Sequence, residues 1–248
     1  MIGNNIIELE ETLSTNRYAS ELISASEISE GTVISAVNQT LGRGSDGSFW
    51  EGEKGKNLTL SIVLYPEFLS IKKQFLLNKV ASLSIYDMIV KLNPNHKEVM
   101  IKWPNDIYIG NKKISGILIE NAILGDTLKH SIIGIGININ QEIFVSDAPN
   151  PTSLKINTGK TYNLKECLSI LCSCFDRRYA QLKNSGLSVL DHDYLSALYL
   201  INTPAHYIFQ KQFISAVIKG VAESGKLILE KINGETVECD FKEVEFVK

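Results

Sequence analysis

The sequence predicts an α+β (mixed α/β) protein with a small all-β domain at its C-terminal end. Short runs rich in Ile, Val and Leu alternate with longer stretches whose apolar residues recur at helical spacing. This helical spacing stops at about residue 202, and the rest of the chain has only short strand-like runs separated by turn residues. We therefore predict a larger domain over residues 1–202 and a small β domain over residues 203–248.

The larger domain contains both kinds of element. The strand-like runs are residues 6–9, 32–37, 58–64, 99–101, 107–109, 114–119 and 131–139. Helical spacing marks residues 15–25, 75–90, 163–182 and 187–198. Ser14 is in position to cap the first helix, and Asn163 with Glu166 is typical of a helix start. The sequence thus indicates strands and helices mixed along one chain.

Two long segments show neither the helical spacing of apolar residues nor a strand-like apolar run. Residues 39–57 are rich in glycine and charge, and residues 141–161 are punctuated by proline and glycine. A loop of this length inside a compact domain is usually functional or mobile. In the small domain we expect turns at Gly220, at residues 224–225 and at the Asn-Gly pair 233–234, which is a strong hairpin signal.

Composition excludes several functional classes. The hydrophobic fraction of 44% and the charged fraction of 21% over 248 residues are ordinary for a globular protein. A net charge of -3 provides no basic field, so we expect no DNA binding. No apolar run approaches the roughly 20 residues that span a bilayer, and no signal peptide is recognisable. The four cysteines are not at zinc-ligand spacing, so we expect a chain that works in the cytoplasm, away from membranes.

Residues 99–121 carry charges beside strands that otherwise look buried. Lys102, Asp106 and Lys113 stand at strand ends in this segment. Burying a charge is costly unless it is paired or meets a ligand, so these residues are candidates for a site. For the Lys112–Lys113 pair alone, a solvated hairpin tip is the preferred interpretation.

Three other motifs add polar groups. Glycines in residues 42–44 let the backbone approach an anion, and Arg43 can bind phosphate or carboxylate; an ordinary flexible loop is an equal alternative. Residues 14–16 at a helix start suit a polar group or an anion, or simply cap the helix. Glycines in residues 134–140 indicate a close neighbour or a bulge. The residues alone predict an anion site without a P-loop, in an enzyme of nucleotide, phosphoryl or acyl transfer.

Considered jointly, these motifs resemble those of the biotin protein ligase family, in the monofunctional type without an N-terminal DNA-binding domain. The segments that carry the resemblance are Gln39, Gly42-Arg43-Gly44, Trp50, Gly55 and Asn57-Leu58; Lys102-Trp103-Pro104-Asn105-Asp106, Lys113 and residues 116–120; and residues 134–140. The resemblance implies a central mixed β-sheet with flanking helices, as in class II synthetases, and a small SH3-like β-barrel over residues 203–248.

The resemblance also implies a reaction. Biotin and ATP would form biotinyl-5′-adenylate with Mg²⁺ present, and a lysine of a biotin carboxyl carrier domain would then take the biotin and release AMP. A homodimer is a further expected partner. Two alternatives stay open: a lipoate-type protein ligase or acyltransferase of the same fold, and a non-catalytic biotin-binding protein.

Site residues follow from the same resemblance. The expected catalytic residues are Lys113, Arg43 and Asp106. Those expected at biotin are Ser14, Thr15, Asn16, Gln39, Gly42, Arg43, Gly44, Lys113 and Gly116. Those expected at the nucleotide are Arg43, Trp50, Asn105, Lys113 and Asn138. The sequence assigns no metal ligand. The family commonly has further basic residues in the glycine-rich loop where this chain has Ser45 and Asp46, so we expect weaker retention of the adenylate.

Overall fold

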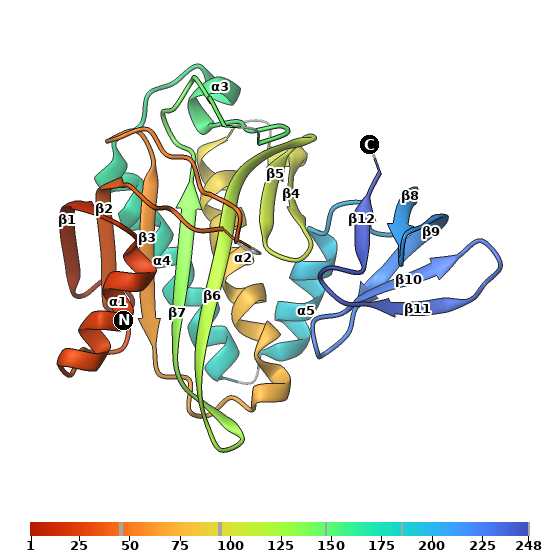
Figure 1. The fold of residues 1–248 in the computed structure, drawn as a ribbon, viewed down its shortest axis with the longest axis horizontal. Coiled ribbons are helices and arrows are strands. Elements are labelled where there is room, and N and C mark those ends of the chain that lie inside the picture. The colour runs from red at the N-terminus through yellow and green to blue at the C-terminus, as the bar shows by residue number, and fades with distance from the viewer. Residues whose placement is uncertain (45–46, 94–95, 147, 185, 248) are drawn as a thin grey trace.

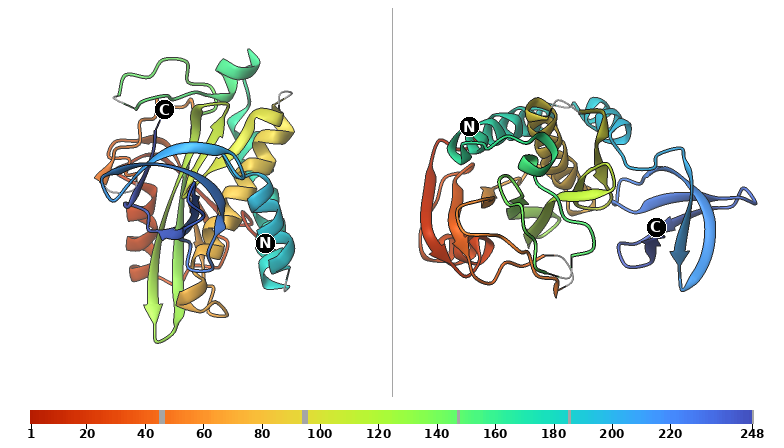
Figure 2. Two further views of the ribbon diagram at one scale, coloured as in Figure 1. Left: turned by 90° about the vertical axis from the view of Figure 1, so that its right-hand side faces the viewer. Right: turned by 90° about the horizontal axis from the view of Figure 1, so that it is seen from above.

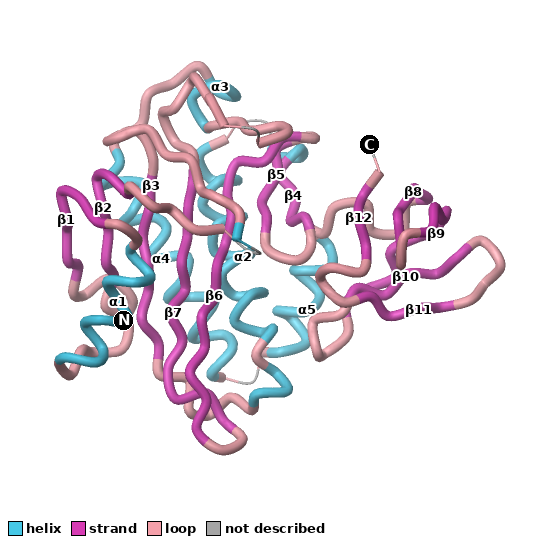
Figure 3. Tube along the Cα trace, viewed as in Figure 1, coloured by secondary structure: helices cyan, strands magenta, loops and turns pink. Residues whose placement is uncertain are grey.

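The computed structural model describes residues 1–44, 47–93, 96–146, 148–184 and 186–247. Two β-sheets organise the chain, a large one packed against helices and a small one at the C-terminal end (Figure 1). Figure 3 shows the same arrangement coloured by secondary structure. Within the described ranges, no helix is long and apolar enough to cross a membrane.

The large sheet has seven strands in the order β1-β2-β3-β7-β6-β5-β4. They are β1 (Ile6–Thr12), β2 (Val33–Gln39), β3 (Leu58–Leu64), β4 (Val99–Lys102), β5 (Asp106–Ile109), β6 (Lys112–Leu124) and β7 (Thr127–Ile137). β1 pairs with β2 in parallel and the other neighbours are antiparallel, so the sheet is mixed. β3 is buried along its whole length, as a continuous apolar run in a central strand requires.

The two faces of this sheet are covered differently. On one face lie α2 (Phe75–Leu92), α4 (Leu164–Lys183) and α5 (Leu187–Ser196), as the view from above in Figure 2 shows. On the other face α1 (Thr15–Ala25) packs on β2, β3 and β7, and the glycine-rich loop crosses the ends of β6 and β7. The short helix α3 (Leu154–Thr158) and 3-10 turns at Ile71–Lys73 and His96–Glu98 complete the helical structure described. The glycine-rich loop therefore has a sheet surface beneath it that no long helix occupies.

The small sheet is antiparallel throughout, in the order β11-β10-β9-β8-β12. Its strands are β8 (Pro204–Phe209), β9 (Gln212–Val221), β10 (Leu227–Lys231), β11 (Thr236–Cys239) and β12 (Val244–Phe246). Tyr207, Ile218 and Leu229 are fully buried and join the same apolar cluster as the large sheet. Trp103 Nε1 also donates to the Gly225 carbonyl at 2.8 Å. The boundary at 202/203 precedes β8, but the shared core leaves the division into two domains as a prediction.

Most expected elements are confirmed, and the structure differs from the expectations at four places. Gly220 lies inside β9 instead of in a turn, beside a register shift that a glycine accommodates readily. The predicted loop at 141–161 contains α3, because Ser153 caps it by accepting from Ile156 N at 3.2 Å. Ser14 occupies the N-cap of α1 but makes no capping hydrogen bond; Gln39 Oε1 accepts from the Thr15 N–H instead. The run at 114–119 is also longer than expected, since β6 extends to Leu124.

The four cysteines are buried and free. Burial raises the pKa of Cys167, Cys172 and Cys239 to about 11 each. A thiol with a raised pKa holds its proton at neutral pH and is a poor nucleophile or metal ligand. These residues serve as small apolar side chains of the core, as their spacing indicates.

Candidate active site

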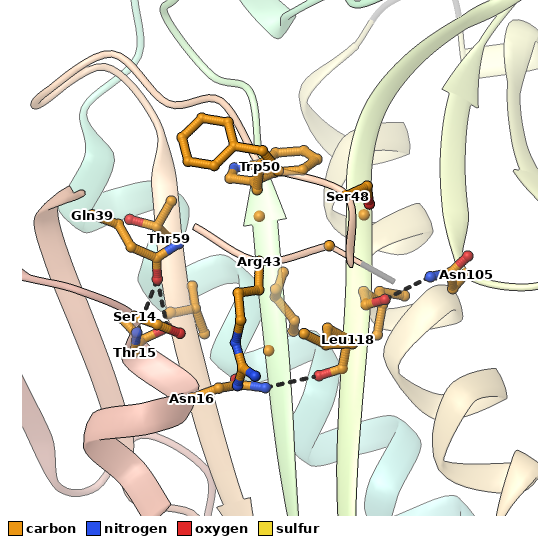
Figure 4. Close-up of a pocket in the computed structure, with 18 of the residues that line it drawn as sticks. Ser14, Thr15, Asn16, Gln39, Arg43, Ser48, Trp50, Thr59, Asn105 and Leu118 are labelled. Atoms are coloured by element: carbon orange, nitrogen blue, oxygen red, sulfur yellow. Dashed lines mark hydrogen bonds between the residues drawn. The ribbon is translucent and has the colours of Figure 1, made fainter. Parts of the chain in front are cut away.

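A cavity lies between the large sheet, the start of α1 and the glycine-rich loop (Figure 4). The expected site residues that line it are Ser14, Thr15, Asn16, Gln39, Arg43, Gly44, Trp50, Asn105, Asp106, Lys113 and Gly116. Two others, Gly42 and Asn138, are not among the lining residues. The structure thus brings together segments that are up to 122 positions apart in the chain, counting from residue 14 to residue 136.

One end of the cavity is a network of neutral polar side chains. Gln39 Oε1 accepts from the backbone N–H of Thr15 at 2.9 Å and from its hydroxyl at 3.2 Å. Ser61 Oγ is 2.8 Å from Thr15 Oγ1 and donates to Asn16 Oδ1 at 2.6 Å. Thr15, Asn16 and Ser61 are almost fully buried, so their mutual bonds offset the cost of removing them from water. This end suits a ligand with neutral donors and acceptors.

The floor of the cavity is built from glycines of β7. Gly134 pairs with Ser61 and Gly136 with Thr59, so the two glycines and the two hydroxyl residues alternate along one face. A Cβ on Gly134 would lie 3.0 Å from Asn16 Cγ and closer still to Asn16 Oδ1. The glycines are therefore required by close neighbours, as one of the two sequence interpretations predicts.

Trp50 covers this floor. A Cβ on Gly136 would lie 2.6 Å from Trp50 Nε1, and one on Gly116 would lie 3.1 Å from Trp50 Cζ3, so the indole rests on both glycines. The loop holds Trp50 by its backbone, since the Trp50 N–H donates to the Gly42 carbonyl at 2.9 Å. About 70 Å³ of cavity is left, below the roughly 300 Å³ of a small-ligand pocket. A ligand must therefore displace the indole to occupy the floor.

Substituting Gly136 with alanine should displace Trp50 and leave the strand in place, because the loop can move more easily than a central strand. We expect a red shift of tryptophan emission and a change in unfolding free energy of under ~1 kcal/mol. Fluorescence spectroscopy measures the emission shift, and urea unfolding measures the change in unfolding free energy. Gly52→Ala in the same loop is the matched control, since its Cβ would meet atoms only at 3.8 Å. Unchanged emission in Gly136→Ala would contradict this placement of the indole.

The opposite end of the cavity carries an ion pair. Lys113 Nζ lies 2.6 Å from Asp106 Oδ1, with the two side chains 35% and 20% exposed. Lys113 Nζ also lies 5.9 Å from the centre of the Trp50 ring. The backbone of Lys113 is held by the segment that precedes α3, through bonds with Asn150 and Thr152. Two of the three expected catalytic residues are therefore in contact, beneath the indole.

A β-bulge gives Lys113 this orientation. Ile107 pairs with Ser115, but the next residue, Tyr108, pairs with Lys113, so β6 has one extra residue at this point. Residues 113 and 116 would face opposite sides of a regular strand. With the bulge both face the cavity, and a Cβ on Gly116 would lie 3.4 Å from Lys113 Cε. Bulges commonly redirect a side chain beside a functional site.

Lys102, the third charge noted in this segment, lies elsewhere. Its Nζ is 4.8 Å from the centre of the Phe246 ring and 3.2 Å from the Tyr108 hydroxyl, on the side of the small sheet. Burial lowers the pKa of Lys102, and the Asp106 carboxylate opposes this shift. Lys102 therefore joins the two sheets and does not line the cavity. Asn105 does line it, and its amide donates to the Ile117 carbonyl at 2.7 Å.

Arg43 stands at the mouth of the cavity beside Asn16, as Figure 4 shows. Its Nη2 lies 2.9 Å from Glu120 Oε1 in β6. Both side chains are partly exposed, at 54% and 39%. The guanidinium is therefore near the cavity but is bound to a carboxylate of the protein.

Two expected residues take supporting positions. Gly42 lies within the glycine-rich loop, where a Cβ would be 2.5 Å from the Trp50 carbonyl oxygen and 2.8 Å from Gln39 Nε2. Asn138 is buried just beyond β7 and donates through Nδ2 to the Thr152 carbonyl at 3.0 Å. Within the described ranges its Oδ1 has no hydrogen-bond partner. Ser45 and Asp46 lie outside the described residues.

Sequence reasoning missed several residues of the site. Thr59 lines the cavity, Ser61 lies in its hydrogen-bond network, and Glu120 binds both Asn16 and Arg43. A signal for the first two was available, since they are polar residues two positions apart in an otherwise apolar strand. Glu120 belongs to the segment 116–120 that carries the resemblance, but a carboxylate at the end of an apolar run is also typical of a solvated strand end, so the sequence alone does not assign it to the site. Among the described residues, no group of three or more His, Cys, Asp and Glu could hold a metal ion.

Comparison with known proteins places this geometry in a family. A model described as the biotin/lipoate A/B protein ligase family matches residues 9–138, which is just over half of the chain and includes all cavity-lining segments. The chain belongs to this family. The resemblance that the three motifs indicate is thereby confirmed, and so is the fold class, with its mixed sheet, helices and second antiparallel sheet.

Individual ligases of the family support the assignment. The bifunctional ligase/repressor BirA of Bacillus subtilis (strain 168) is 31% identical over 193 residues, which cover 76% of this chain and 58% of that protein. The biotin–[acetyl-CoA-carboxylase] ligase of Paracoccus denitrificans is 29% identical over 233 residues, covering 92% and 95% of the two chains. The biotin protein ligase from Aquifex aeolicus in complex with biotin and ATP superposes with a TM-score of 0.81, at 26% identity and 99% coverage of both chains. The chain thus spans 58% of the length of the Bacillus relative and nearly all of the other two.

Proposed function

We propose that this protein is a biotin–[biotin carboxyl-carrier protein] ligase, which activates biotin with ATP and transfers it to a lysine of a carrier domain. The observation that carries the proposal is the polarity of the cavity, which has neutral hydrogen-bonding groups at the Thr15–Gln39 end and a lysine paired with a carboxylate at the other. A ureido group and a carboxylate at the two ends of biotin would match these ends. The Paracoccus relative is named for this activity, which supports the proposal.

Lys113 and Arg43 would act in the first step. The biotin carboxylate must approach the α-phosphate of ATP, and the two anions repel one another. Lys113 would bind the carboxylate and the α-phosphate, and Arg43 the phosphates, so that both stabilise the charge developing at phosphorus. The products are biotinyl-5′-adenylate and pyrophosphate. Binding would displace Trp50 from the glycine floor, after which the indole would cover the adenylate.

Asp106 would act in the second step. The acceptor lysine has an ordinary pKa of about 10.4 and must lose a proton before it attacks the mixed anhydride. Asp106 lies 2.6 Å from Lys113 Nζ, so it is within reach of a group that approaches the activated carboxyl carbon. It would orient the acceptor amine or accept its proton, and AMP would then leave.

The remaining assignments are part of the same proposal. Ser14, Thr15, Asn16 and Gln39 would hold biotin's polar groups, while Asn105 and Asn138 would lie on the nucleotide side. Mg²⁺ would be held chiefly by phosphate oxygens and water, since among the described residues no group of three or more His, Cys, Asp and Glu could hold it. The bound Mg²⁺ would neutralise part of the negative charge of the phosphates.

The partner would be the biotin carboxyl carrier domain of a cytoplasmic carboxylase. A homodimer through the edge of the large sheet also stays a prediction, as does the division into a catalytic domain (1–202) and a β domain (203–248).

The proposal is tested by incubating the protein with a purified carrier domain, ATP and Mg²⁺, and adding either biotin or lipoate. We expect biotin-dependent pyrophosphate release and a carrier whose mass increases by one biotinyl group, with little product from lipoate. The family includes lipoate ligases, so the lipoate arm is informative. Preference for lipoate would identify a lipoate ligase, and biotin binding without pyrophosphate release would identify a non-catalytic binding protein.

A further inference from the structure

Glu120 of β6 touches two residues of the candidate site from outside the cavity. Its Oε1 accepts a hydrogen bond from Arg43 Nη2 at 2.9 Å, and its Oε2 accepts one from Asn16 Nδ2 at 2.7 Å. Arg43 and Asn16 line the cavity and also an adjacent groove between α1 and the glycine-rich loop, whereas Glu120 lines only the groove. One carboxylate therefore connects the loop, the helix and the sheet.

The two contacts of Glu120 differ in strength. Asn16 is 3% exposed, and its side chain also bonds Ser61 Oγ and the Leu118 carbonyl, so this end is firmly anchored. The ion pair with Arg43 is between side chains that are 54% and 39% exposed. Exposed ion pairs contribute little to stability, because water and salt screen them. Arg43 can therefore leave Glu120 while Asn16 holds the carboxylate in place.

We propose that Glu120 is a positioning residue that holds Arg43 at the mouth of the cavity and competes with the nucleotide for its guanidinium. The inference rests on the proposed function, in which Arg43 binds the phosphates of ATP. A triphosphate has more charge and more acceptor oxygens than a carboxylate, so it takes the guanidinium from Glu120. The charge of Glu120 thus weakens ATP binding, while its hydrogen bond to Asn16 supports the biotin end.

Glu120→Gln separates these two effects. The amide keeps an oxygen acceptor for Asn16 but loses the charge that attracts Arg43. We expect the KM for ATP to fall about two- to five-fold, where five-fold is equivalent to about 1 kcal/mol. The kcat and the KM for biotin should change less than about two-fold. A purely structural role predicts a lower melting temperature and a higher KM for both substrates.

A second variant and a double mutant complete the test. Glu120→Ala removes the charge and the acceptor, so the KM for ATP should fall as in Glu120→Gln while the KM for biotin rises. In an Arg43→Gln background, Glu120→Gln should leave ATP binding unchanged, because the competition has been removed. The matched control is Glu21→Gln, which breaks the similarly exposed Arg17–Glu21 pair (2.8 Å) in the same groove and should not alter the KM for ATP.

The dissociation constant for ATP, measured by calorimetry on the same variants, tests Glu120 without turnover. A wild-type protein that binds ATP but forms no pyrophosphate would overturn the proposed function, while tighter ATP binding by Glu120→Gln would still support the inference. An active wild type whose Glu120→Gln variant binds ATP equally well or more weakly would overturn the inference alone.

Discussion

Replacing Lys113 with alanine is expected to lower biotin-dependent pyrophosphate release by about 100- to 1,000-fold, the usual effect of removing one group that stabilises transition-state charge. The bulge in β6 directs this side chain into the cavity, where its ammonium meets Asp106 and lies beneath Trp50. Without it, the carboxylate of biotin and the phosphate of ATP would meet with less compensating charge. Single-turnover pyrophosphate release at saturating ATP and biotin measures the chemical step.

Lys112→Ala is the matched control for this prediction. Lys112 is the neighbouring lysine and is exposed, so its loss should leave the rate within about two-fold of wild type. Melting curves of both variants separate a chemical effect from a folding effect, because Lys113→Ala leaves Asp106 without its partner. A folded Lys113→Ala protein with the wild-type rate would refute the assignment of this lysine.

Substituting Gly134 with alanine is expected to destabilise the protein and weaken biotin binding. The new Cβ would collide with the amide of Asn16, which is bonded to Ser61 and Glu120 and lies in the first turn of α1. Overpacking a well-packed interior costs about 1–3 kcal/mol, and here the buried hydrogen bonds must also shift. Urea unfolding measures the stability, and calorimetric titration with biotin measures the affinity.

Gly220→Ala is the control for a glycine inside a strand. A Cβ at Gly220 would meet only Ile228 Cδ1 at 3.9 Å, which is an ordinary contact. We expect its unfolding free energy to stay within about 0.5 kcal/mol of wild type. If Gly134→Ala were as stable as this control and bound biotin normally, the close contact between β7 and α1 would have no energetic role.

Gly134→Ala and Gly136→Ala should differ from one another, although the two residues are neighbours on the floor. The first collides with a side chain in a helix that packs on the sheet, and the second collides with an indole carried by a loop. A helix packed on a core can relax only partly, whereas a loop residue can move away. The first variant should therefore lose stability, and the second should mainly change the environment of Trp50.

The elements of the fold were predictable because their signals are local. The apolar run of β3, the helical spacing of α2 and α4, and the Asn-Gly turn at residues 233–234 each depend on neighbours a few positions away. The misplaced turn at Gly220 shows the limit of such signals, since a glycine marks a turn or a place where strand pairing shifts. Whether Gly220 forms a turn or a shift in pairing depends on how β10 pairs with β9. The local spacing of residues does not encode this register.

By itself, the sequence determined the order of strands and helices, the motifs that identify the family and most residues that line the cavity. Only the tertiary structure decided how these residues meet. A period of two places Lys113 and Gly116 on opposite faces of a strand, and the bulge opposite β5 brings both to the cavity. Glu120 meets Arg43 and Asn16 across 77 and 104 positions of chain, and Lys102 turns away toward the small sheet. Local spacing determines which residues share a face of one element, whereas sheet register and packing determine which faces come together.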